Sequence, residues 1–265
     1  AMDGEPLLEK RYLEEENRKE KRFVNRFGEE SKKLWNISGP AIFTYIAQYS
    51  LGALTQTFAG QLGEIELAAV SVENSVIAGL VFGAMLGMGS ALETLCGQAF
   101  GAGQIQMLGI YMQRSWVILF ATACLLLPIY LFAPPILIFF GESDDISRAA
   151  GKFALYMIPQ LFAYAANFPI QKFLQAQRKV MAMAWISAIV LVLHTFFSWL
   201  LILKLEWGLI GAAITLNTSW WLISIFQMIY IFYVNSDGAW SGFTWLAFRD
   251  LYGFIKLSLA SAVML

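Results

Sequence analysis

Apolar segments long enough to cross a bilayer occupy most of the sequence from Leu34 onward. A helix needs ~20 residues to cross a hydrocarbon core ~30 Å thick. Six segments reach that length, and their short connections exclude a series of buried helices in a soluble protein. We therefore predict an all-α membrane protein with spans at approximately Leu34 to Phe58, Leu67 to Cys96, Ile110 to Phe132, Phe153 to Phe173, Met181 to Leu203 and Leu209 to Val234, and a seventh helix starting within 251–265.

The composition agrees with a membrane protein. Hydrophobic residues make up 58% and charged residues 14% of the chain, whereas soluble domains have about 45–50% and about 25%. Of the 37 Asp, Glu, Lys and Arg residues, nine acids and nine bases fall in residues 1–33. This segment has no apolar stretch, so we predict a charged cytosolic tail, either partly disordered or a loose helix. Its DGEPLL run, Asp3 to Leu8, fits an acidic dileucine sorting pattern.

Basic residues in the connections predict the orientation, because cytoplasmic loops are enriched in Lys and Arg. With the tail inside, fifteen bases lie on the cytosolic side and three on the other. We therefore expect the tail and the connections after spans two, four and six, including a linker at 235–250, to be cytosolic. The three bases of the far side are Arg148, Lys152 and Lys204.

Polar residues recur at helical spacing inside the apolar segments. Hydrocarbon penalises such side chains, so they are expected to face the interior of the bundle or a cavity. Hydrogen bonding between helices is the simplest interpretation of any one of them, but five polar stripes together favour a shared aqueous pocket. The first stripe comprises Thr44, Gln48, Gly52 and Thr55, and the fourth comprises Gln160, Tyr164, Asn167, Gln171 and Gln175. The candidates for the substrate cavity are Tyr45, Gln48, Asn74, Tyr164, Asn167, His194, Asn217 and Trp221.

Two ionisable residues within the spans need separate interpretation. Glu73 is either a possible proton site or a residue near the outer interface that reaches water. His194 is the single histidine, interpreted as a satisfied core residue, with a proton relay as the alternative. Cys96 and Cys124 lie in apolar runs without metal-site or disulfide spacing, so we interpret both as core residues.

Glycines and prolines predict packing and bends. Gly79, Gly83 and Gly87 recur every four residues, which predicts close approach of another helix of the same bundle. Prolines remove backbone donors, so we expect the fourth span to be kinked. The hinge or kink candidates are Pro40, Pro159 and Pro169.

No enzymatic, metal or nucleic-acid site emerges from the sequence. The chain has no complete dinucleotide fingerprint, P-loop or nucleophile with a nearby histidine, and no basic patch interleaved with aromatic residues. A carrier or a channel is therefore expected before an enzyme, with no metal and no cofactor.

Several runs resemble the plant branch of the multidrug and toxic compound extrusion (MATE) family. The resemblance covers about residue 32 to the end of the chain and rests on ALETLCGQAFGAG (Ala91 to Gly103), MIPQ (Met157 to Gln160), FLQAQ (Phe173 to Gln177), GLIGAA (Gly208 to Ala213) and LSLASAVML (Leu257 to Leu265).

The resemblance implies a fold of twelve helices in two lobes, with this chain as the six-helix N-terminal lobe (34–234), the linker and the start of helix seven. It also implies a monomeric proton-coupled antiporter that exports or sequesters flavonoids, xenobiotics or organic cations, in a vacuolar or plasma membrane. Prokaryotic relatives carry a coupling aspartate on the first helix, but this chain has no acid from Leu34 to Gln61. The principal proton site is therefore expected beyond Leu265. A channel or a non-transporting membrane scaffold is the alternative.

Overall fold

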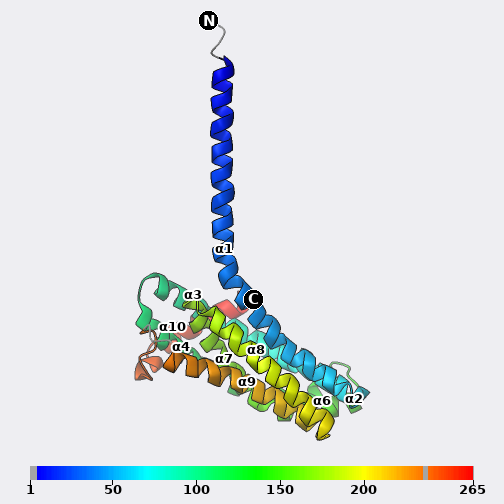
Figure 1. Cartoon of the computed structure of the whole chain (residues 1–265). Helices are drawn as coiled ribbons and strands as arrows, with labels where there is room; N and C mark the ends of the chain where they lie inside the picture. The colour runs from blue at the N-terminus through cyan, green and yellow to red at the C-terminus, as the bar shows by residue number, and fades with distance from the viewer. Residues whose placement is uncertain (1–4, 235–237, 265) are drawn as a thin grey trace.

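The computed structural model describes the backbone of residues 5–234 and 238–264 and the side chains of 22–234 and 238–260. The regular elements of this part of the chain are all helical (Figure 1). The DGEPLL run lies outside the described side chains. In chain order the helices are α1 (Glu5–Ala59), α2 (Glu64–Val72), a π-helix η1 (Glu73–Ile77), α3 (Ala78–Gly101), α4 (Ile105–Leu131), α5 (Ala133–Phe139), α6 (Asp144–Tyr156), α7 (Ile158–Ala176), α8 (Val180–Ser198), a π-helix η2 (Trp199–Lys204), α9 (Gly208–Tyr233), a 3₁₀-helix η3 (Trp245–Phe248) and α10 (Leu251–Met264).

Helix α7 is the centre of the bundle. It packs against α3, α4 and α9, while α1 packs along α8 and α10 returns to pack against α3. Thirteen of the nineteen residues of α7 are buried. The buried apolar side chains form two clusters, one centred on Phe153, Leu161 and Phe168, the other on Phe173 and Met112. All-helical architecture is what the apolar segments predicted.

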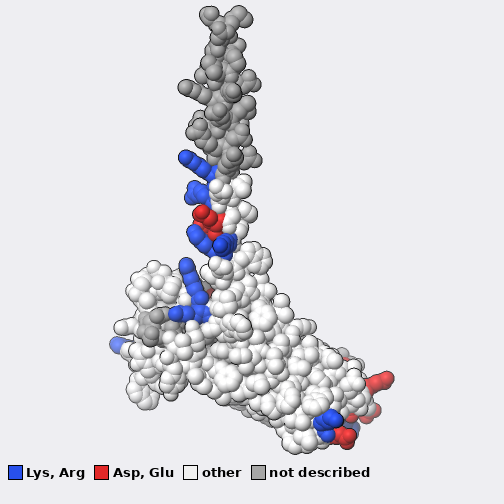
Figure 2. Space-filling model, in the orientation of Figure 1, with Lys and Arg blue, Asp and Glu red and all other residues white. Residues whose placement is uncertain are grey.

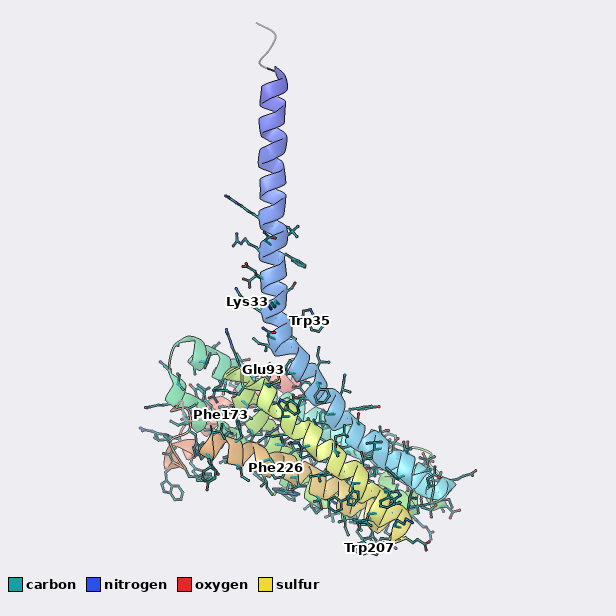
Figure 3. All side chains as sticks on the ribbon, viewed as in Figure 1. Lys33, Trp35, Glu93, Phe173, Trp207 and Phe226 are labelled. Atoms are coloured by element: carbon teal, nitrogen blue, oxygen red, sulfur yellow. The ribbon has the colours of Figure 1, made fainter. Side chains whose placement is uncertain are left out.

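Helix α1 joins the charged tail and the first predicted span in one helix of 55 residues. The tail is therefore helical from Glu5 rather than partly disordered. Figures 1 and 3 show that α1 changes direction just after Trp35 and that its N-terminal half projects away from the bundle. Pro40 lies inside this helix. The Pro40 nitrogen has no hydrogen to donate to a carbonyl of the preceding turn. The carbonyl oxygen of Pro40 accepts a hydrogen bond from Thr44 Oγ1 at 2.8 Å.

Four helical segments of the described chain are long and apolar enough to cross a membrane. They are Glu64–Gly101, Ile105–Leu131, Val180–Lys204 and Gly208–Tyr233, at the second, third, fifth and sixth predicted spans. The first and fourth predicted spans do not meet the same criterion. These two carry the first and fourth polar stripes, whose Thr, Gln and Asn residues lower the mean hydropathy of α1 and α7.

The fourth predicted span, Phe153 to Phe173, is wrong as a single helix. Helix α6 ends at Tyr156, and α7 begins at Ile158 with Pro159 in its first turn. Proline is suited to the first turn of a helix, where its missing N–H has no intrahelical acceptor. The predicted kink is therefore a break between two helices, placed at Met157.

The two ends of the bundle carry opposite charge (Figure 2). One end gathers the α1–α2, α5–α6 and η2–α9 connections, with six acids and three bases within 60–66, 140–152 and 204–207. The other end gathers the tail, the α3–α4 and α7–α8 connections and the linker. There Arg114, Lys172, Arg178, Lys179 and Arg249 are accompanied by Glu93 and Asp250. The connections expected on the same side of the membrane thus lie at the same end.

The linker is held against α4 at its described residues. Gln113 Nε2 donates to the Gly242 carbonyl oxygen at 3.0 Å, and the Thr244 N–H donates to Gln113 Oε1 at 2.9 Å. A Cβ at Gly109 would meet the Ala239 carbonyl oxygen at 2.6 Å, so only glycine permits this approach. Ala239 itself is buried.

Two packing predictions are wrong. Cys96 is buried, but Cys124 is exposed because it lies on the outward face of α4 beside the exposed Leu125. Gly79 and Gly83 are exposed, and a Cβ built at Gly83 meets no atom within 4 Å. Among the described residues, no neighbouring helix packs against the glycine row at these two positions, although Gly87 is buried.

Candidate functional site

A cavity of about 310 Å³ opens between α1, η1, α3, α7 and α9. Its volume falls at the lower end of the range of small-molecule pockets, ~300–1,000 Å³. The lining combines amides, phenols and an indole with small residues, and among the described lining residues none carries a formal charge. They are Tyr45, Gln48, Tyr49, Gly52, Ala53, Gln56, Asn74, Ser75, Ala78, Gly79, Phe82, Gln160, Tyr164, Leu216 and Trp220.

The π-helix η1 sets the direction of the side chains that follow Glu73. A π-bulge widens one turn of an α-helix and is frequent at functional sites. Here Asn74 and Ser75 line the cavity, while Glu73 is buried. Across the cavity, a Cβ at Gly52 would lie 3.7 Å from Asn74 Nδ2, which is ordinary van der Waals contact. Gly52 thus leaves space in front of the Asn74 amide.

Three amides of the lining offer unpaired polar atoms. Within the described residues, Gln48 Nε2, Asn74 Nδ2 and Gln160 Oε1 have no hydrogen-bond partner. An unpaired buried polar atom costs free energy of about 1–3 kcal/mol. These two donors and one acceptor are buried in this conformation, so each would have to turn toward the cavity to bind a hydroxyl or carbonyl group of a solute.

Aromatic rings form one wall of the cavity. Trp220 and Tyr164 meet edge to face, with ring centroids 4.7 Å apart and planes at 88°. Phe82 contacts Tyr164 in the same manner, at 5.6 Å and 85°. Such pairs fix the orientation of each ring, so the wall offers a preformed apolar surface to a planar solute.

Half of the predicted cavity residues line this cavity. Tyr45, Gln48, Asn74 and Tyr164 do so, whereas the other four lie elsewhere. Sequence reasoning missed Trp220 because its neighbour Trp221, at helical spacing from Asn217 and Ser224, fitted the polar pattern of the sixth span better. The positions outside the cavity are Asn167, His194, Asn217 and Trp221.

Asn217 and Trp221 hold the break between α6 and α7. Asn217 Nδ2 donates to the Tyr156 carbonyl oxygen at 2.8 Å, and Trp221 Nε1 donates to the Pro159 carbonyl oxygen at 3.1 Å. A helix end leaves carbonyl groups without intrahelical donors. Tyr156 is the last residue of α6, and Asn217 supplies the donor that its carbonyl oxygen lacks. Trp221, one turn further along α9, adds a hydrogen bond to the first turn of α7.

His194 connects three helices. Its Nε2 lies 3.1 Å from Thr55 Oγ1 on α1, and its Nδ1 lies 2.8 Å from Ser219 Oγ on α9. The ring is buried, and both nitrogens have a hydroxyl partner. This agrees with the interpretation of His194 as a satisfied core residue.

Glu73 does not reach water, so the interfacial interpretation is wrong. Its side chain is 0% exposed, because α6 and the apolar core cover η1. Within the described part of the chain, neither carboxyl oxygen has a hydrogen-bond partner. The buried phenol groups of Tyr130 and Tyr164 lie close enough to Glu73 to interact electrostatically with its carboxyl group. An ionised carboxylate without a partner is strongly disfavoured in such surroundings.

A charged pair joins two of the sequence motifs. Lys172, directly before FLQAQ, places its Nζ 2.6 Å from Oε2 of Glu93 in ALETLCGQAFGAG. The Lys172 side chain is 9% exposed and that of Glu93 is 61% exposed. The pair therefore links α7 to α3 at the basic end while the carboxylate stays in contact with solvent. Among the described residues, no three His, Cys, Asp or Glu side chains are grouped so that they could hold a metal ion.

The bundle, with its break before α7 and its open cavity, resembles half of a solved membrane transporter fold. The structure is similar to the crystal structure of the eukaryotic MATE transporter AtDTX14, with a TM-score of 0.84 and 32% identity over 89% of this chain and 53% of that chain. A Vibrio cholerae MATE transporter, VcmN in the bent form, matches with a TM-score of 0.73 over 88% of this chain and 54% of that chain. At 18% identity this second likeness shows the fold alone.

The family model MatE matches residues 40–200, and the chain belongs to this family. It is 76% identical to Protein DETOXIFICATION 33 of Arabidopsis thaliana over 92% of this chain and 50% of that relative. Protein DETOXIFICATION 31 of the same plant is 64% identical over 92% and 47%. The chain spans about half the length of the curated relatives it matches. It is an integral membrane protein, and the named solved relatives are transporters rather than enzymes.

Proposed function

We propose that this chain is the first lobe of a proton-coupled antiporter that exports or sequesters amphipathic organic solutes by alternating access. The observation that supports this most directly is the cavity, which combines an aromatic wall with unpaired amide atoms. Small-molecule sites typically combine apolar walls with a few orienting polar groups. The family and the likeness to solved MATE transporters support the same class of function.

The cavity favours polyhydroxylated aromatic solutes such as flavonoids. Their rings match the wall of Trp220, Tyr164 and Phe82, and their hydroxyl groups match the amides of Gln48 and Gln160. An organic cation would depend on aromatic faces alone, because the described lining offers no carboxylate. Xenobiotics of similar shape are candidate substrates for the same reason. We propose the vacuolar membrane as the location of the protein.

Proton coupling requires a titratable group whose protonation changes the balance between two conformations. Helix α1 has no acid between Leu34 and Ala59. Glu73 is fully buried rather than placed at the cavity surface. We therefore place the principal proton site beyond Leu265, with Glu73 as a second candidate. No resident cofactor is needed, since the proton gradient supplies the free energy.

The test is flux into proteoliposomes that contain the full-length protein, with an imposed proton gradient and a flavonoid glycoside as solute. Saturable uptake that a protonophore abolishes is expected. A channel would instead give ion conductance that does not saturate, and a scaffold would give neither. Either of these results would refute the proposal, whereas saturable uptake that is insensitive to the protonophore would refute the proton coupling alone.

A further inference from the structure

We propose that the segment Arg22–Trp35 of α1 is an interfacial helix that lies on the anionic leaflet of the membrane from which the tail emerges. Nothing in the proposed transport function requires this contact. The inference comes from the arrangement of apolar and basic side chains around the helix, and from the point at which the helix joins the bundle.

The apolar side chains of this segment share one face and are uncovered. At ~100° per residue, Phe23, Val24, Phe27, Leu34 and Trp35 fall within a sector of about 120°. Phe23, Phe27, Leu34 and Trp35 are 70%, 65%, 64% and 66% exposed. The rings of Phe23 and Phe27 lie against each other, with centroids 6.4 Å apart. So large an apolar face on a helix outside the bundle needs an apolar partner.

The opposite face of the same helix is basic. Arg22, Arg26, Lys32 and Lys33 fall within another sector of about 120°, centred on the far side of the helix. Glu29 shares this face, and Glu30 lies at its border, paired with Lys33 at 2.8 Å. Figure 2 shows the bases along this part of α1. Basic polar faces opposite aromatic and aliphatic ones are typical of helices that lie in a membrane interface.

The charge of the tail also varies along its length. Residues 18–33 contain seven bases and three acids, whereas residues 1–17 contain two bases and six acids. The basic half is the one next to the first membrane helix. Basic segments in that place are attracted to anionic lipid headgroups, by about fivefold in binding for each base near the surface. A protein partner would not require the bases to gather beside the membrane.

The position of the helix relative to the bundle fits this occupant. Trp35 lies at the change of direction of α1, between the projecting half and the half that packs in the bundle (Figure 3). At the same end, the linker and the start of α10 expose Phe243, Trp245 and Tyr252 at 76%, 86% and 82%. Aromatic residues of this kind concentrate at membrane–water interfaces. The apolar face of 22–35 therefore lies at the same end of the bundle as these exposed aromatic side chains.

Spin labels report the contact directly. In a background with Cys96 and Cys124 replaced by alanine, single cysteines are placed at Phe23 and Phe27 and, as matched control, at Asn25 on the polar side. The chain is reconstituted in nanodiscs of phosphatidylcholine alone or mixed with phosphatidylserine. Accessibility to oxygen, which enters lipid, is compared with accessibility to a water-soluble nickel complex.

With phosphatidylserine, labels at 23 and 27 should be oxygen-accessible and shielded from nickel, while the label at 25 stays nickel-accessible. Replacing Arg22 and Arg26 by glutamine should lower the ratio of lipid-bound to free helix by about fivefold for each base. The control Asn25→Gln should not change it. Nickel access at all three positions in both membranes would overturn the proposal. Labels at 23 and 27 that both reagents fail to reach would also overturn it, since a protein surface would then cover the face.

Discussion

Glu73 and His194 are both fully buried, but their surroundings give them different roles. The ring nitrogens of His194 are paired with Thr55 and Ser219, whereas the carboxyl oxygens of Glu73 are unpaired within the described residues. A paired polar group contributes to packing, and an unpaired one costs free energy unless it stays neutral. His194 is therefore a structural connection between helices. The apolar surroundings of Glu73 favour its neutral form.

Gln48 belongs to the first polar stripe and Asn167 to the fourth, and the structure separates their expected effects. Gln48 lines the cavity and has an unpaired Nε2, whereas Asn167 is buried outside it. Gln48→Leu should weaken the apparent affinity of transport, by up to about tenfold for one hydrogen bond of ~0.5–1.5 kcal/mol. Asn167→Leu should leave affinity and thermal stability nearly unchanged, because Asn167 lies outside the cavity and its Oδ1 has no hydrogen-bond partner among the described residues. Concentration-dependent uptake and thermal unfolding distinguish the two. Equal affinity in Gln48→Leu and the parent protein would show that the amide does not contact the solute.

Gly83 tests the outward face of α3. Because a Cβ there meets nothing within 4 Å, Gly83→Leu should leave the melting temperature of this chain unchanged. Gly109→Leu is the contrasting variant, since its side chain would collide with the linker and overpacking costs ~1–3 kcal/mol. A large loss of stability in Gly83→Leu would mean that another helix covers this face.

At the scale of elements, the sequence predicted the polar stripes but not their partners. The spacing of Gln160, Tyr164 and Asn167 was enough to place them on one buried face of α7, because period and polarity are local properties. Proline chemistry likewise predicted a disturbance near Pro159. The bonds from Asn217 and Trp221 join residues about sixty positions apart, and they depend on how α9 packs against α7. The π-helix η1, which contains both Glu73 and Asn74, also lacks a local sequence signal.

The hydrogen bonds from Asn217 and Trp221 of α9 should stabilise the break between α6 and α7. Asn217→Leu removes the donor to Tyr156 and leaves a carbonyl oxygen unpaired, so the free energy of unfolding should fall by about 1–3 kcal/mol. The neighbouring exposed residue provides the matched control, Thr218→Val, which should have little effect. Thermal unfolding in detergent measures both. The same melting temperature for both variants would assign the break to Pro159 alone.

At the scale of the whole molecule, the charge difference between the two ends predicts the orientation in the membrane. Cysteines at Ser143 and Glu206, both exposed at the acidic end, should react with a membrane-impermeant reagent from outside. A cysteine at Ser31 in the tail should react only after permeabilisation. The background again has Cys96 and Cys124 replaced. Reaction of the Ser31 position from outside would reverse the proposed orientation.

We expect that the first lobe alone lacks the site that couples transport to protons. A gradient of one pH unit provides only ~1.4 kcal/mol per proton, so loss of the group that binds this proton should abolish concentrative uptake. Residues 1–265 alone should insert into membranes without building a gradient of solute.

In the full-length protein, Glu73→Gln should keep most proton-driven transport, because glutamine preserves the size and the neutrality that the dry surroundings of Glu73 impose. Glu206→Gln is the control for an exposed acid. Proteoliposome uptake with and without a proton gradient measures coupling, and binding of the solute to detergent-solubilised protein is measured separately. Loss of coupling in Glu73→Gln, with normal expression and solute binding, would place the proton site in this lobe.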